Sequence, residues 1–222
     1  MALKIEGIEL HWLGHAGFKI KSGKVIYIDP YHIGDSEPAD IILITHSHYD
    51  HCSIEDIRKI VKDNTAIICP ADCQSAITKI DKKVNMQLIE AGEKLKLGNI
   101  EFHAVPAYNI NKQFHEKSEG WVGYVIKLGK VIIYHAGDTD LTEDMKKLTG
   151  YSKEGNKFIA LLPIGGKFTM NYEEASQAAE IIKADIAIPM HYGTIISSGD
   201  DAEKFQDLCK DNGIEAKIME IG

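Results

Sequence analysis

The feature that most constrains the fold of this chain is a polar loop that directly follows an apolar run. Residues 40–45 read Asp-Ile-Ile-Leu-Ile-Thr, and this run of Ile and Leu predicts a fully buried strand. Four polar side chains then come within six residues: His46, His48, Asp50 and His51. Three imidazoles and one carboxylate are ligands that divalent transition metals prefer. Because one tetrahedral ion does not comfortably take four ligands from one loop, the pattern predicts two metal ions at a strand end.

Two later strands end in a similar way. The apolar run Lys130–His135 leads to Asp138, and the run Asp185–Pro189 leads to His191. Taken alone, Asp138 would be interpreted as a helix N-cap and His191 as a structural histidine. Their occurrence together with the first loop instead predicts one set of metal ligands drawn from several strand ends.

Charge and cysteine content narrow the class of protein. The 222 residues carry 25 basic and 33 acidic side chains, for a net charge of -8, which argues against general binding of nucleic acids or anionic membranes. Arg58 is the only arginine, so a bidentate arginine clamp for phosphate is not expected. The four cysteines, at positions 52, 69, 73 and 209, have no metal-site spacing and predict free buried thiols.

The chain shows no pattern typical of a signal peptide and no apolar run of membrane-spanning length. We therefore expect a cytoplasmic protein that acts on a small-molecule substrate, with no nucleic-acid and no membrane partner. The sequence leaves a homo-oligomer open.

The order of the predicted elements indicates the architecture. In the first half of the chain, several predicted strands follow one another and then alternate with helices. The second half repeats this order. This order predicts an α+β fold, an αββα sandwich of two mixed sheets packed face to face with helices on both outer faces, in a single domain spanning residues 1–222. The predicted strands are Ile8–Leu13, Phe18–Lys21, Val25–Asp29, Asp40–Thr45, Ala66–Cys69, Met86–Glu90, Lys94–Leu97, Ile100–Val105, Trp121–Leu128, Lys130–His135, Phe158–Leu162, Asp185–Pro189 and Ala216–Ile221, and the predicted helices are Ile54–Lys62, Ala71–Ile80, Leu141–Leu148, Tyr172–Ile182 and Ala202–Lys210.

The ligand set and its order resemble those of the metallo-β-lactamase superfamily, over nearly the whole chain. The likeness is closest to the branch of metal-dependent hydrolases related to ascorbate-6-phosphate lactonase. This resemblance implies His46 and His48 on one metal, Asp50, His51 and His191 on the other, and Asp138 between them. Four stretches carry the closer likeness: Trp12–Gly17, Val105–Asn109, Tyr134–Thr139 and Pro189–Thr194.

One position departs from the pattern of the superfamily. Its members usually supply a further histidine to the first metal from the loop after the middle strand, where this chain reads Tyr108-Asn109. His115 is the preferred replacement, because it lies in a polar loop whereas His103 lies within a predicted strand. Asn109 is the alternative, through its carbonyl oxygen, and a mononuclear site is the third arrangement left open.

The chemistry follows from the ion. A divalent metal lowers the pKa of a bound water, and the activated water attacks a carbonyl or phosphoryl centre. Asp50 would orient the nucleophile and take up its proton, while His15 and His135 are candidate hydrogen-bond partners of the ligands or proton donors. Two zinc ions are expected, with manganese or iron as alternatives, since the same ligands serve all three.

Substrate contacts are less strongly indicated. Lys112 and Lys167 lie in loops that we expect on the same face as the metal ligands, where their point charges would hold an anionic group of the substrate. Tyr192 would line the substrate pocket. The expected function is a hydrolase for a small ester, lactone or phosphoester. The competing hypotheses are a non-catalytic metal- or ligand-binding protein and a nuclease, and the acidic charge disfavours the nuclease.

Overall fold

The computed structural model describes residues 2–34, 36–153, 155–193 and 199–222. Within this part of the chain the strands form two sheets of seven strands each. Each sheet lies in its own compact unit: the first unit comprises Met1–Glu90 and Met219–Gly222, and the second unit comprises Ala91–Ile218. Thr194, the last residue of the stretch Pro189–Thr194 that resembles the superfamily, lies outside the described residues.

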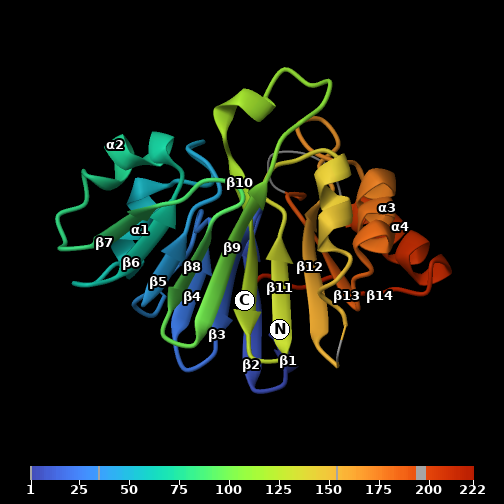
Figure 1. Ribbon diagram of the computed structural model, residues 1–222, viewed down its shortest axis with the longest axis horizontal. Helices are drawn as coiled ribbons and strands as arrows, with labels where there is room; N and C mark the ends of the chain where they lie inside the picture. The colour runs from blue at the N-terminus through green and yellow to red at the C-terminus, as the bar shows by residue number, and fades with distance from the viewer. Residues whose placement is uncertain (1, 35, 154, 194–198) are drawn as a thin grey trace. The chain divides into compact units, whose positions relative to one another are not determined.

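The sheet of the first unit changes from antiparallel to parallel pairing as the sequence predicts. Its spatial order follows the chain from β1 to β7 (Figure 1). The meander from β1 to β4 is antiparallel, and the remaining pairs are parallel. Only β1 was not predicted, because three residues are too short for a periodic signal. The strands are β1 (Leu3–Ile5), β2 (Ile8–Gly14), β3 (Gly17–Lys21), β4 (Val25–Ile28), β5 (Ile41–Leu43), β6 (Ala66–Cys69) and β7 (Asn85–Leu88).

Two helices, α1 (Ile54–Ile60) and α2 (Gln74–Ile77), cover one face of this sheet. Register partners Tyr27, Ile42 and Ile67 lie in one apolar cluster with Ile57 of α1 and Ile77 of α2. Burial of these apolar side chains stabilises the unit and holds the helices against the strands.

The two helical predictions in the first unit differ in accuracy. Ser53 caps α1, and its Oγ accepts the Asp56 N–H at 3.3 Å. The predicted helix Ala71–Ile80 is wrong in extent, since the structure has a 3-10 turn at Ala71–Cys73 and then the short α2. The Thr78 hydroxyl donates to the Ser75 carbonyl at 3.0 Å, which competes with continuation of the helix.

The sheet of the second unit repeats the same change of pairing. Antiparallel pairs join β8 to β11, and parallel pairs join β11 to β14. Gly129 closes the β10–β11 hairpin with φ 64, as expected for a tight turn. The strands are β8 (Lys94–Leu97), β9 (Ile100–Pro106), β10 (Val122–Leu128), β11 (Val131–His135), β12 (Lys157–Pro163), β13 (Ile186–Met190) and β14 (Glu215–Ala216).

The last predicted strand, Ala216–Ile221, is mostly wrong. Only Glu215 and Ala216 pair with β13, and the chain then leaves the sheet. Ile221 instead forms an isolated bridge with Trp12 of the first unit, to which the chain end belongs. An apolar stretch at a chain end therefore satisfied a strand pattern without supplying a full strand.

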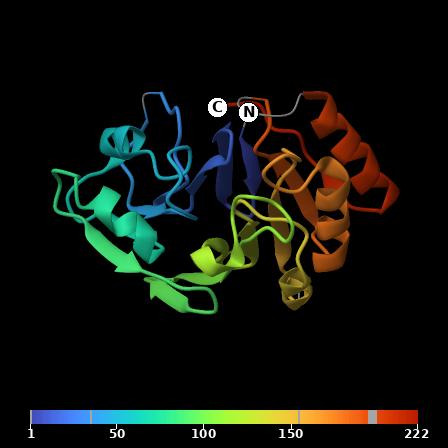
Figure 2. The same cartoon turned by 90° about the horizontal axis from the view of Figure 1, so that it is seen from above.

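Helices α3 (Tyr172–Ile182) and α4 (Gly199–Asp211) pack on each other and on β12 to β14 (Figure 2). The bounds of α3 agree with the prediction, because Asn171 and Glu174 form a capping box that marks its start. The predicted helix Leu141–Leu148 is a 3-10 helix, η3, over Glu143–Leu148. A further 3-10 turn, η2, spans Lys117–Glu119. Among the described residues, none of the helices is both long enough and apolar enough to cross a membrane.

The prediction of two mixed sheets with helices is confirmed. In each unit the polar loops of interest follow the carboxyl ends of strands, the usual position of ligand sites in such sheets. In the first unit these loops follow β4 and β5, and in the second unit they follow β11, β12 and β13.

Candidate functional site

The polar loop after β5 brings its histidines together in the first unit. His46 and His48 are two residues apart where the chain begins to bend, and His46 Nε2 is 3.1 Å from His48 Nδ1. The loop then turns, with the N–H groups of His51 and Cys52 donating to the His48 carbonyl at 3.0 and 2.8 Å. The turn places His51 beside His46, with ring centroids 4.0 Å apart. The bend and the turn thus bring together the histidines that the spacing predicts to converge.

A buried carboxylate, Asp29 at the end of β4, supports this loop. Asp29 Oδ1 accepts the Thr45 N–H at 2.8 Å, and its Oδ2 accepts from the Thr45 hydroxyl at 2.6 Å. The same Oδ2 lies 2.7 Å from His51 Nδ1, and Thr45 Oγ1 lies 2.9 Å from His46 Nδ1. Asp29 and Thr45 therefore contact the Nδ1 side of two candidate ligands.

These bonds determine which nitrogen of each imidazole carries the proton. The Thr45 hydroxyl has one proton and donates it to Asp29, so its oxygen accepts from His46 Nδ1–H. His51 likewise donates from Nδ1 to the Asp29 carboxylate. Assigned in this way, both rings present an unprotonated Nε2, the form that binds a metal. The roles of Asp29 and Thr45 were not predicted from the sequence. The one sign of Asp29 in the sequence is that it directly follows β4, the strand that pairs with β5, after which the histidine loop begins.

His15 and Asp50 form a second contact within the first unit. His15 is buried in the turn between β2 and β3, and its Nε2 lies 3.0 Å from Asp50 Oδ2. The same carboxylate oxygen lies 3.8 Å from His51 Nε2. Asp50 is therefore within reach of the His15 imidazole on one side and of a candidate ligand on the other.

In the second unit, Asp138 lies between two histidines. Its Oδ2 is 3.2 Å from His115 Nε2 and 3.1 Å from His191 Nε2, and all three side chains are buried. One carboxylate oxygen close to two imidazole nitrogens is the arrangement expected of a ligand shared by two ions.

The loop that carries His115 is held by Asn109. The Asn109 N–H donates to the His115 carbonyl at 2.6 Å. Its side-chain Nδ2 donates to the carbonyls of Phe114 and Phe168 at 2.8 and 2.7 Å, which uses both amide protons. The Asn109 Oδ1 is buried and has no hydrogen-bond partner among the described residues. His103 lies in β9, with its Nδ1 3.0 Å from the Tyr151 hydroxyl, so His115 rather than His103 adjoins Asp138.

A glycine makes room for His191. A Cβ added at Gly165 would lie 2.9 Å from the His191 carbonyl oxygen and 3.0 Å from its Nδ1, closer than real Cβ contacts allow. His135 is fully buried at the end of β11, and its Nδ1 accepts the Gly137 N–H at 3.2 Å. In this position His135 holds the turn that leads to Asp138.

Backbone conformation marks several of these residues. His15, Asp29, His115 and His191 have φ values of 50, 44, 63 and 60, in the left-handed region that residues with a Cβ rarely adopt. Such conformations cost of order 1–3 kcal/mol each and persist where surrounding contacts over-determine them, commonly at functional sites. No sequence pattern predicts this strain.

The predicted substrate residues have different surroundings. Lys112 is paired with Asp140 and donates to the Thr169 carbonyl at 2.6 Å, so its charge holds the loop of the second unit. Lys167 is exposed, and its Nζ lies 5.0 Å from the centroid of the Phe168 ring. Tyr192 is buried, and burial raises the pKa of its hydroxyl. Of these three, Lys167 presents its charge to solvent.

The donor sets fit a divalent transition metal. The donors are imidazole nitrogens and carboxylate oxygens, the ligand types that such ions bind. Two donors bound at about 2.0–2.2 Å to one tetrahedral ion lie roughly 3.3 Å apart. The 3.1 Å contact between His46 and His48 and the contacts of Asp138 are close to this spacing.

Comparison with known proteins identifies the family. The model of the beta-lactamase superfamily domain matches residues 9–191. A UPF0173 metal-dependent hydrolase of Pyrococcus furiosus is 35% identical over 222 residues, which cover 96% of this chain and 95% of the relative.

Solved structures share the fold over the whole chain. A protein of Parabacteroides distasonis assigned as a metal-dependent hydrolase has a TM-score of 0.83 and 26% identity, with 100% of this chain and 98% of that chain covered. Igni18, a metallo hydrolase of Ignicoccus hospitalis, has a TM-score of 0.77 and 26% identity, with 97% and 96% covered. These matches confirm the predicted metallo-β-lactamase fold. The chain belongs to the metallo-β-lactamase superfamily and, within it, to the UPF0173 family of metal-dependent hydrolases.

Proposed function

We propose that this protein uses two divalent metal ions, zinc in the first instance, to hydrolyse a small ester, lactone or phosphoester. The lactone substrate class is part of the proposal because the sequence resembles relatives of ascorbate-6-phosphate lactonase. The proposed ligands are those that the superfamily resemblance implies, together with His115 as the replacement at the departing position: His46, His48, Asp50, His51, Asp138, His191 and His115.

The observation that carries the proposal is the position of Asp138. Its Oδ2 lies within 3.2 Å of His115 Nε2 and within 3.1 Å of His191 Nε2. A carboxylate in that position neutralises charge between two cations, which a protein that binds a single structural ion does not require. This geometry also favours His115 over Asn109 as the third ligand of the first metal.

The residues of the chain have separate tasks in the proposed reaction. The metals, when bound, supply a water that is activated near neutral pH and a positive charge for the developing oxyanion. Asp50 would orient the water and accept its proton at Oδ2, and His15 Nε2, which lies 3.0 Å from that oxygen, would share the proton. Asp29 and Thr45 keep His46 and His51 in the tautomer that leaves Nε2 available.

Hydrolysis can be tested on the metal-loaded protein with a panel of esters, lactones and phosphodiesters. We expect turnover on at least one class, its loss on chelation and its return when zinc is added back. Asp138→Ala should lower kcat/KM by roughly a hundredfold or more, because the shared ligand is removed. Asp81→Ala, which truncates an exposed aspartate of the first unit, is the matched control and should retain activity.

Two results would contradict the proposal. Turnover that survives complete removal of metal would exclude a metal-activated water. Full metal content without turnover on any class would favour the non-catalytic binding protein instead.

A further inference from the structure

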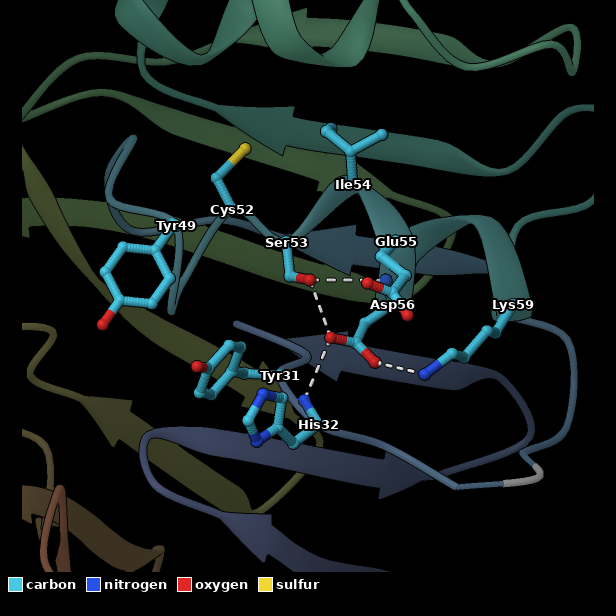
Figure 3. Close-up of a pocket in the computed structure, with 9 residues that line it drawn as sticks. All are labelled: Tyr31, His32, Tyr49, Cys52, Ser53, Ile54, Glu55, Asp56 and Lys59. Atoms are coloured by element: carbon cyan, nitrogen blue, oxygen red, sulfur yellow. Dashed lines mark hydrogen bonds and ion pairs between the residues drawn. The ribbon is translucent and has the colours of Figure 1, made fainter. Parts of the chain in front are cut away.

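A pocket of about 420 Å³ lies beside the ligand-bearing loop of the first unit (Figure 3). One wall comes from the segment after β4, with Tyr31 and His32, and the other comes from the loop and the start of α1, with Tyr49, Cys52 and further residues. Its volume is in the range of small-molecule sites.

Three rings line the mouth of this pocket. Tyr31 and His32 are stacked, with centroids 3.9 Å apart and planes at 20°, and Tyr49 meets Tyr31 edge-on at 6.0 Å and 75°. Tyr49 is 68% exposed. Large aromatic side chains kept at the surface around a hollow are typical of binding sites, because burying them against a partner is favourable.

The pocket is built from fixed parts. Asp56 is buried and accepts hydrogen bonds from the His32 N–H at 3.0 Å, the Ser53 hydroxyl at 2.7 Å and the Lys59 ammonium at 2.8 Å (Figure 3). Because these bonds join the segment after β4 to the start of α1, both walls are held in position before any ligand binds.

The pocket adjoins the proposed reaction centre through two of its rings. Tyr49 stands in the sequence between His48 and Asp50. The Tyr31 ring lies 5.8 Å from the ring of His15, whose Nε2 contacts Asp50. A group held against these tyrosines would therefore belong to a substrate whose reacting bond lies near Asp50.

The charges of the lining disfavour an anionic group. The lining carries one ammonium, Lys59, and two carboxylates, Glu55 and Asp56. The Lys59 ammonium is already occupied by Asp56 and by the Ile33 carbonyl at 3.0 Å. A phosphate or carboxylate would meet a net negative lining, whereas a neutral ring would meet aromatic faces and edges.

We propose that this pocket is a substrate subsite for an aromatic ring without an anionic substituent, placed against Tyr31 and Tyr49, so that the enzyme prefers aryl substituents on the ester or lactone it cleaves. This inference rests on the proposed hydrolase function for its catalytic consequence, but the binding site itself is testable without turnover.

The test uses the full chain with its metal, labelled with ¹⁵N and titrated with benzamide, cyclohexanecarboxamide and benzoate. Benzamide should shift the amide resonances of residues 31, 32 and 49–55, and should bind roughly threefold or more tighter than either other probe. Tyr31→Ala and Tyr49→Ala should each weaken benzamide binding by roughly three- to tenfold. Leu88→Ala, which truncates an exposed apolar side chain of the same unit, is the matched control and should bind as the unchanged protein does.

Equal affinity for benzamide and cyclohexanecarboxamide would overturn the aromatic subsite, as would benzamide binding that both tyrosine variants retain or resonance shifts confined to other residues. Methyl glucoside, titrated in the same way, would also overturn the proposal if it bound at these amides as tightly as benzamide, since the site would then take a sugar. Turnover measured on the same samples separates the two proposals: ring binding without turnover leaves the subsite and removes the hydrolase, and turnover without ring binding does the reverse.

Discussion

Two of the candidate ligands, His46 and His51, differ from ordinary surface histidines because their Nδ1 atoms are hydrogen-bonded to other buried residues. His46 and His51 are buried, and their Nδ1 atoms are bound through Thr45 and Asp29. A buried imidazole without such partners would rotate or change tautomer, and would bind a metal less tightly. The ordering of the ligands is therefore a property of Asp29 as much as of the histidines themselves.

Replacing Asp29 tests this role. In Asp29→Asn the amide cannot accept from all three donors, so His51 should lose its preferred tautomer. We expect metal affinity, measured by competition with a chelator, to fall roughly 10- to 100-fold. Asp81→Asn, an exposed aspartate of the same unit, is the control. An unchanged affinity in Asp29→Asn would show that the histidines are ordered by packing alone.

The residues of the site could be predicted only where they are close in sequence or share a strand-end position. The loop with His46, His48 and His51 is evident from spacing alone. The role of Asp29 could not be predicted, because its bonds to Thr45 and His51 join residues 16 and 22 positions apart. The role of Asn109 could not be predicted either, because its backbone hydrogen bond to the His115 carbonyl forms only when the loop between β9 and β10 is folded.

Close approach between loops sets the positions of the candidate ligands in the second unit. The loop after β12 passes so near to His191 that only a glycine fits at position 165. The loop from β9 to β10, which carries His115, is fixed to η3 by Asp144, which accepts from the Tyr108 hydroxyl at 2.9 Å. Two loops far from each other in sequence are thereby set around Asp138.

Gly165→Ala should displace His191 without unfolding the unit. The added methyl would meet the His191 carbonyl oxygen at 2.9 Å, and relieving that overlap should cost about 1–3 kcal/mol of stability. We expect lower metal content by elemental analysis, with far-UV circular dichroism preserved. Gly150→Ala is the control, because a Cβ there meets nothing within 4 Å. Normal metal content in Gly165→Ala would mean that His191 is not held in place by this contact.

Asp144 gives the loop a dependence on pH. Hydrogen bonds from Lys147 and Tyr108 lower the pKa of its carboxyl from 3.8 to about 2. Because the folded pKa is below the unfolded one, the ionised group stabilises the fold above about pH 4, and this contribution is lost as the pH falls towards 2.

The thermal midpoint of Asp144→Asn should accordingly be lower than that of the unchanged protein at pH 7, by about 2–4 °C for a loss of about 1 kcal/mol. The difference should shrink as the pH falls from 4 to 2. Glu143→Gln, the neighbouring exposed carboxylate, should show a smaller difference. If the difference in thermal midpoint between Asp144→Asn and the wild-type protein stays constant down to pH 2, the ionised Asp144 is not its cause.

Element boundaries were predictable where local chemistry marks them. The capping box of Asn171 and Glu174 marks the start of α3, and Gly129 marks the hairpin of β10 and β11. The prediction was wrong where apolar spacing had no such marks, in the helix over Ala71–Ile80 and the strand over Ala216–Ile221. In both places local hydrogen bonds or a different pairing partner replaced the expected element.

At the scale of the whole molecule, the order of strands and helices was enough to predict two mixed sheets, since a meander followed by β-α alternation occurs twice in the chain. The chemistry could be predicted to the level of a metal-dependent hydrolase, because the ligands stand at strand ends in a recognisable order. The proposed aromatic subsite could not be predicted from the sequence, because it is built from Tyr31, Tyr49 and α1, whose proximity depends on the fold.

The proposed site holds two metal ions, and His115 completes the ligands of the first. The most direct test is the metal content per chain, by elemental analysis, of the protein purified without added metal and of its His115→Ala variant. His103→Ala, in which a histidine of β9 is removed, serves as the control. We expect two ions per chain, falling to one in His115→Ala and remaining two in His103→Ala. A single ion, or a content that His115→Ala leaves unchanged, would contradict this expectation.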